Sequence, residues 1–328
     1  MSTSTSRRRC NGSGDCRRST RRPATSGCGT ASAISPRDSL TTALHDRSVV
    51  QATLMRSTIH MVAADDFWSM CAGIRESRRE WWLRIAKSRR LPDIDYDAVA
   101  RVLREVLADG PRPRLDLVAA LERAGYPKPV WEGAGSWVEL VRVPPSGTWE
   151  RRRADRYGLG EQWVPPTDAS EVDGLRLLLT RYLQAFGPAN LADAATWAGV
   201  PRSRVEPVAA SMDLITYRDE AGAALVDLGN AALTDPDVRA PVRLLPTWDA
   251  TLLAHCRHAA ILPEHHRQAI FHTKNPQSVG TVLVDGAVAA TWAWRTDHIE
   301  IGELSKLTAK QRREVDAEAE RLAAFYRA

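Results

Sequence analysis

The segment 170–229 constrains the fold more than any other part of the chain, because its helical and extended stretches follow one another in a fixed order. Apolar residues recur at helical spacing until Gly187 and Pro188 end the run. Asn190 is a favourable cap for a second helix, and Pro201 begins a third. The expected elements are helices over 173–186, 191–199 and 202–212 and strands over 213–217 and 224–228. Three helices followed by a hairpin is the order of a winged helix.

Residues 94–160 carry a weaker copy of the same pattern. Glycines and prolines end each amphipathic stretch, and a Pro-Pro-Ser-Gly turn precedes strand-forming residues. We expect helices over 96–108, 115–124 and 131–143 and strand material over 148–157. Upstream, residues 36–63 contain a predicted helix (36–46) and paired strands (49–62), which are the last helix and the wing of a further module. Residues 64–93 then form a connecting helix rich in arginine.

The last part of the chain, 240–328, changes character. Asp285 and Gly286 form a dipeptide that favours a tight hairpin turn. The expected elements here are strands over 280–284 and 287–294 and a closing amphipathic helix over 310–326. The predicted fold class is therefore α+β and mainly α, with tandem winged-helix modules, the third over 166–230, followed by a small C-terminal β-rich domain.

The first 35 residues differ from the rest in composition. They hold seven arginines, one acidic residue and three of the five cysteines, and Ile34 is their only aliphatic residue beyond alanine and the initiator methionine. Seven positive charges against one negative give this segment +6, so the remaining residues sum to −1 within the chain's net charge of +5. The bulk charge therefore does not establish nucleic-acid binding, which must depend on local patches.

The same segment cannot supply the two amphipathic helices that should precede residue 36, because it lacks apolar residues at helical spacing. Two interpretations of residues 1–35 stay open. One is a disordered Arg/Ser tail that contacts phosphates without sequence preference. The other is the start of the fold, read out of frame.

Several signals exclude whole classes of protein. No apolar run approaches the ~20 residues that span a membrane, and the N-terminus lacks the apolar core of a secretory signal. Cys10, Cys16 and Cys28 have neither zinc-finger spacing nor histidine partners. We expect a cytoplasmic monomer with no metal, no cofactor and no membrane partner.

Four strings carry a resemblance to a known family: LMRSTIHMV (54–62), LLPTWDATLLAH (244–255), RHAAILPEHHR (257–267) and TVLVDGAVAATW (281–292). In this order they resemble bacterial winged helix DNA-binding domain-containing proteins. That family includes azinomycin-resistance-type DNA glycosylases, which excise alkylated bases and unhook interstrand crosslinks. The resemblance covers roughly residues 36–328. It implies tandem winged helices around a DNA channel, with double-stranded DNA, alkylated or crosslinked, as the partner.

The family's catalytic motif, Gln–apolar–Gln before the first wing, is missing from residues 1–53, where Gln51 stands alone in a predicted strand. We therefore assign no catalytic residue and expect the chain as written to be inactive. The out-of-frame interpretation of residues 1–35 would account for the loss. If residues 15–20 are encoded by GAC TGC AGG CGC AGT ACG, one choice among the codons that fit them, reading from a third base gives Leu-Gln-Ala-Gln-Tyr. An in-frame chain is expected to be a monofunctional glycosylase, because no well-placed lysine for a Schiff base is apparent.

The candidates for DNA contact are Arg56, His60, Arg151, Arg152, Arg153, Arg202 and Arg204. Arg56 and His60 alternate on a predicted strand and so share a face, although a buried structural role is at least as good an interpretation of His60. The run 151–153 lies on a predicted wing, where it contacts the DNA backbone or forms a charged edge that discourages strand pairing. Arg202 and Arg204 begin a helix that either meets DNA or only packs against other modules.

Asp249, His255 and Arg257 form a further polar cluster, in or beside the family-like string over 244–255. This cluster lies at the DNA surface or, as we favour, in a buried network that positions the β domain. Three functions remain open for the chain: a protein related to DNA glycosylases, a non-enzymatic DNA-binding or regulatory protein, and a module for protein–protein contact.

Overall fold

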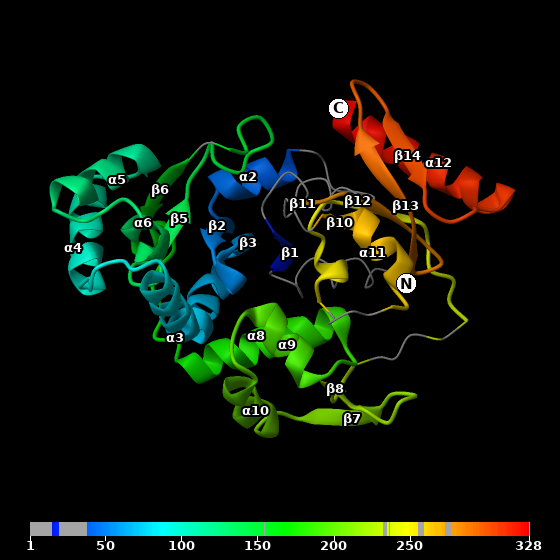
Figure 1. The fold of residues 1–328 in the computed structure, drawn as a ribbon, viewed down its shortest axis with the longest axis horizontal. Coiled ribbons are helices and arrows are strands. Elements are labelled where there is room, and N and C mark those ends of the chain that lie inside the picture. The colour runs from blue at the N-terminus through cyan, green and yellow to red at the C-terminus, as the bar shows by residue number, and fades with distance from the viewer. Residues whose placement is uncertain are drawn as a thin grey trace, which may run out of the picture. The chain divides into compact units, whose positions relative to one another are not determined.

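The structure, a computed structural model, describes residues 15–19 and 38–328 except 154, 232–234, 236, 255–258, 273–276 and 328. Within residues 1–35 the structure describes only the backbone of 15–19, so neither interpretation of this segment is tested. The chain divides into two compact units, one built mainly on 41–229 and the other mainly on 230–328 (Figure 1).

The first unit begins with a helix and a hairpin, as the pattern over 36–62 predicts. The elements are α2 (Ser39–His45), β2 (Val49–Thr53), the 3-10 turn η1 (Met55–Ser57), β3 (Ile59–Ala63) and α3 (Ala64–Ser88). Phe67, Met70 and Ile74 are buried because their spacing of three and four residues puts them on one face of α3. The helix α3 is the predicted connecting helix.

The next segment differs from its prediction in two places. Its elements are α4 (Tyr96–Leu107), β4 (Arg112–Pro113), α5 (Arg114–Arg123), α6 (Val130–Ala134), β5 (Leu140–Arg142), β6 (Arg156–Leu159) and α7 (Gly160–Trp163). The helix predicted over 131–143 is wrong beyond Ala134, because Gly133 and Gly135 weaken helix formation and the following residues pair as β5. The strand predicted over 148–157 begins only at Arg156, since the preceding residues form a compact loop in which the Thr148 hydroxyl donates to the Pro145 carbonyl.

Strands from these two segments and one N-terminal strand form a single sheet, which the sequence does not predict. The order is β1-β3-β2-β5-β6-β4, where β1 is Asp15–Ser19. β2 pairs antiparallel with β5, so that Gln51 lies opposite Arg142, and β5 pairs antiparallel with β6. The hairpin of 49–63 and the strands of 112–159 are therefore continuous through their backbone hydrogen bonds.

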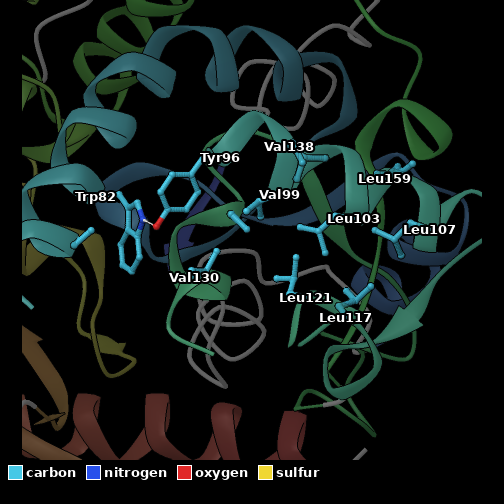
Figure 2. Close-up of a cluster of buried hydrophobic side chains, with 13 residues drawn as sticks. Trp82, Tyr96, Val99, Leu103, Leu107, Leu117, Leu121, Val130, Val138 and Leu159 are labelled. Atoms are coloured by element: carbon cyan, nitrogen blue, oxygen red, sulfur yellow. Dashed lines mark hydrogen bonds between the residues drawn. The ribbon is translucent and has the colours of Figure 1, made fainter. Parts of the chain in front are cut away.

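One core of this unit gathers around Trp82 of α3 and Tyr96 of α4 (Figure 2). The Trp82 indole N–H donates to the Tyr96 hydroxyl at 2.5 Å, and the Tyr96 ring stacks on Trp137 with centroids 4.3 Å apart. Leu103 and Leu107 continue the buried face of α4, and neither is exposed to solvent. This hydrogen bond gives the Trp82 N–H its acceptor, which makes the burial of the indole favourable.

The segment 170–229 has the predicted order of elements: α8 (Glu171–Phe186), α9 (Leu191–Ala198), α10 (Arg202–Ala210), β7 (Leu214–Arg218) and β8 (Ala224–Leu228). A bridge between Ala189 and Val226 adds a third extended segment to the hairpin. The helices α3 and α8 cross at Gly73 and Gly174, where a Cβ on Gly73 would lie 2.6 Å from the Gly174 carbonyl carbon. Asp66 and Arg181 form a bidentate ion pair between the same two helices.

The second unit is the predicted β-rich domain with a closing helix. Its elements are β9 (Arg243–Leu245), η2 (Ala250–Leu252), α11 (Glu264–Ile270), β10 (Phe271–His272), β11 (Gln277–Ser278), β12 (Gly280–Val284), β13 (Ala287–Trp294), β14 (Ile299–Glu303) and α12 (Ala309–Arg327). Its main sheet has the order β14-β13-β12-β9. Asp285 and Gly286 turn between β12 and β13 with φ of 49° and 84°, the left-handed values that a tight hairpin needs. Among the described helices, none combines the length and apolar character needed to cross a membrane.

Candidate nucleic-acid interface

Arg56 does not lie on a strand, so its predicted alternation with His60 is wrong. It occupies the turn η1 between β2 and β3 with φ of 52°. Its guanidinium donates to the carbonyl of Trp197, near the C-terminal end of α9, where a cation is favoured by the helix dipole. The backbone of Arg56 also approaches Gly199 closely, since a Cβ there would lie 2.7 Å from the Arg56 nitrogen. Arg56 therefore connects the first hairpin to the segment 170–229.

His60 is a buried residue of β3, with 3% of its surface exposed. Its Nδ1 lies 3.0 Å from the Thr58 carbonyl oxygen. Burial, together with the positive charges of Arg56 and Arg78, lowers the pKa of His60 to about 4. The imidazole is therefore neutral at pH 7, and its burial fits the structural interpretation.

The arginine run 151–153 lies on the loop between β5 and β6. Arg151 and Arg153 are exposed, whereas Arg152 is half-buried with its guanidinium 4.1 Å from the centre of the Trp149 ring. The backbone of Trp149 donates to the Thr41 hydroxyl, which fixes the loop against the start of the unit. Two of the three arginines thus extend into solvent from an anchored loop.

Arg202 and Arg204 both lie on α10 and both pair with carboxylates. Arg202 bonds to Glu206 one turn later at 2.7 Å and is largely exposed. Arg204 reaches Glu171 of α8 at 2.5 Å and Glu80 of α3 at 2.6 Å. These contacts join α10 to α3 and α8. They fit the second interpretation of Arg204, in which it packs helices together, better than a DNA contact.

Asp249 is the only member of the predicted C-terminal cluster within the described residues, because residues 255–258 are not described. It is 1% exposed, and its carboxylate accepts from the backbone N–H of Thr251 at the start of η2. This contact is an N-cap, which stabilises the local turn. The positions of His255 and Arg257 lie outside the described residues.

The sheet also brings together four residues that the sequence does not single out as a group. Gln51, Arg142, Tyr157 and Arg112 are successive partners across β2, β5, β6 and β4. Directly opposed residues point to the same face of a sheet, so these side chains form one row. Only the strand register reveals this row, because its members lie up to about a hundred residues apart in sequence.

Arg142 is the centre of this row. Its Nη2 donates to the Asp155 carboxylate at 2.7 Å and to the Tyr157 hydroxyl at 2.8 Å, and the guanidinium lies 5.0 Å from the centre of the Tyr157 ring. Burial raises the pKa of Tyr157 to about 12, so this hydroxyl stays protonated. These contacts hold the Arg142 side chain in a single orientation.

Gln51 is nearly inaccessible, with 1% of its surface exposed and no hydrogen-bond partner for its Oε1. The loop between β5 and β6 covers it, since a Cβ on Gly147 would lie 2.7 Å from the Gln51 Nε2. The Gln51 amide therefore lies between the sheet and this loop, where a substrate cannot reach it.

The described part of the chain is thus an α+β protein in which helical segments lead into hairpins, and arginines gather on the loop between β5 and β6. The chain belongs to the DNA glycosylase AlkZ-like family, whose model matches residues 33–325. Its structure is similar to that of the Streptomyces sahachiroi DNA glycosylase AlkZ, with a TM-score of 0.76 and 17% sequence identity over 92% of this chain and 86% of that chain. At this identity the likeness shows the fold. A comparison with curated proteins gives no match.

Proposed function

We propose that the chain is a double-stranded DNA-binding protein made of winged-helix modules and related to glycosylases of alkylated or crosslinked DNA. The family match over 33–325 carries the proposal. The element orders support it, because α8, α9 and α10 lead into the hairpin β7–β8, and α4, α5 and α6 lead into β5–β6. Helix–helix–helix–hairpin is the order of a winged helix.

Base excision by such a protein needs little acid–base power. Alkylation at guanine N7 puts a positive charge on the base and weakens the glycosidic bond. The enzyme must then place a water molecule and stabilise the developing sugar cation, which two carboxamides can do. Residues 1–53 contain no Gln–apolar–Gln, and Gln51 is covered by the loop between β5 and β6. We therefore propose that the chain as written binds DNA without excising bases.

A frame shift before residue 36 explains why the motif is missing. The family match begins at residue 33, so the arginine-rich residues before it lie outside the match. If residues 15–20 are encoded by GAC TGC AGG CGC AGT ACG, one choice among the codons that fit them, a neighbouring frame yields Leu-Gln-Ala-Gln-Tyr, which contains a Gln–apolar–Gln. The gene sequence tests this directly: codons that do not encode this motif in a neighbouring frame would exclude the frame shift.

The activity is tested by measuring release of N7-methylguanine from alkylated duplex DNA by two proteins, the chain as written and the frame-corrected chain. We expect release from the corrected chain alone. If the corrected chain binds the duplex but releases no base, the enzyme proposal fails. The second candidate, a non-enzymatic DNA-binding or regulatory protein, is favoured by the missing motif and would be supported by that outcome.

A further inference from the structure

Two hairpins of the first unit, β5–β6 and β7–β8, carry opposite charge. The strands and loop of β5–β6 together with β4 hold seven arginines against two carboxylates, counted over 112–114 and 142–156. The hairpin β7–β8 with its flanks, 213–229, holds one arginine against four carboxylates. A polyanion is therefore attracted to the hairpin β5–β6 and repelled by the hairpin β7–β8.

Arg142 supplies an oriented cation at the end of β5. Its Nη2 is held by Asp155 and Tyr157, while its Nε is buried without a hydrogen-bond partner. The guanidinium can donate in a fixed fork geometry that matches the oxygens of a phosphate. The Arg142 side chain is 14% exposed, so a phosphate meets only the accessible end of this guanidinium, and the buried Nε takes no part in binding.

Two further arginines lie beside Arg142. Arg112 is exposed and lies opposite Tyr157, on the same face as Arg142. Arg114 is also exposed, and its Nη1 lies 3.9 Å from the Asp155 carboxylate. Arg142 and Arg114 thus share one carboxylate, so the three arginines keep a net positive charge. This excess distinguishes them from Arg202 and Arg204, whose charges are matched by their own carboxylates.

We infer that Arg112, Arg114 and Arg142 bind a backbone phosphate of double-stranded DNA, and that the hairpin β7–β8 stays off the duplex. The inference rests on the proposed DNA-binding function and names the surface that performs it. Tyr157 and Asp155 are positioning residues, because they act on the phosphate only through Arg142. The exposed Arg151 and Arg153 add attraction from the adjoining loop.

The test is the salt dependence of binding to an unmodified duplex, followed by fluorescence anisotropy between 50 and 200 mM salt on the full chain. Arg112→Ala and Arg114→Ala are each expected to reduce the slope of log K against log salt by about 1 and to weaken binding about tenfold at 0.1 M salt. Arg112→Lys should keep the slope. The competing interface on α10 is tested with Arg202→Ala, which removes an exposed arginine. The matched control is Arg101→Ala, which removes one exposed arginine from α4 and should bind like the wild type.

Tyr157→Phe tests positioning without removing a charge. It keeps the ring and deletes the hydroxyl, so binding should weaken while the salt slope stays at its wild-type value. The inference is overturned if the wild type binds the duplex but Arg112→Ala and Arg114→Ala retain its affinity and slope, or if Arg202→Ala alone lowers them. If the wild type binds no duplex at 50 mM salt, the proposed DNA-binding function itself fails.

Discussion

The crossing of α3 and α8 depends on Gly73 and Gly174. Adding one methyl group at this contact tests how much the close approach of the two helices contributes to stability. A Cβ on Gly174 would lie 2.2 Å from the Ser69 carbonyl oxygen and 2.3 Å from the Gly73 nitrogen. Both obstacles are backbone atoms, so no side-chain rotation relieves the clash. The two helices must separate, and the Asp66–Arg181 pair that joins them, with side chains 9% and 17% exposed, must lengthen.

The expected cost of Gly174→Ala is the difference between two effects. Overpacking of a close contact costs about 1–3 kcal/mol, and the weakened ion pair adds to it, since breaking a buried pair is expensive. Replacing glycine by alanine inside a helix returns about 1 kcal/mol. We expect a net loss of about 2 kcal/mol in the free energy of unfolding. For a unit of this size that lowers Tm by about 4–8 °C.

Thermal and urea unfolding followed by circular dichroism measure this loss. The control is Arg84→Ala, an exposed substitution on α3 that should change stability by less than about 0.5 kcal/mol. Gly73→Ala should also be destabilising, and the double variant should cost less than the sum, because both methyl groups open the same crossing. A Gly174→Ala protein as stable as the wild type, or more stable, would refute the reasoning.

Three further predictions follow from local contacts. The pKa of His60 is about 4 in the folded protein against an ordinary 6.5, so the unfolded chain binds more protons between these two pH values. The free energy of unfolding should therefore fall by about 3 kcal/mol as the pH is lowered from 6.5 to 4. Urea midpoints measured over this range should fall for the wild type, and His60→Gln should lack this loss. Arg56→Ala should lower stability by about 2 kcal/mol, measured by urea unfolding, yet leave duplex affinity unchanged, since its guanidinium bonds to the Trp197 carbonyl. Gly286→Ala places a side chain at φ of 84° and should cost about 1 kcal/mol in thermal unfolding, whereas Gly286→Asn should be milder.

Local sequence patterns predict the helices and hairpins of this protein well where start and stop residues are strong. Ser170 and Asp173 form a capping box at the start of α8, and Gly199 ends α9 in the left-handed conformation. The pattern fails over 131–143, because its apolar residues are consistent both with a helix and with a buried strand. There the pairing of β5 with β2 and β6 decides the structure.

The candidate site was harder to predict because its contacts are long-range. Arg204 finds Glu80 across 124 residues, and no local signal distinguishes an arginine that packs helices from one that meets a phosphate. Arg142 and Arg112 come together only through the register of three strands. The basic run 151–153 was visible because its charge is local. A surface assembled from distant strands requires the structure.

The sheet shared by residues 49–63 and 112–159 also determines when this protein can fold. The hairpin β2–β3 joins neighbours in sequence and can form early. The other edge of β2 pairs with β5, and Arg142 of β5 lies roughly ninety positions after its partner Gln51. Pairing between such distant residues slows folding. During synthesis at about 5–20 residues per second, the edge of β2 stays open for several seconds. Contacts that protect this nascent edge should therefore affect the yield of folded protein more than its final stability.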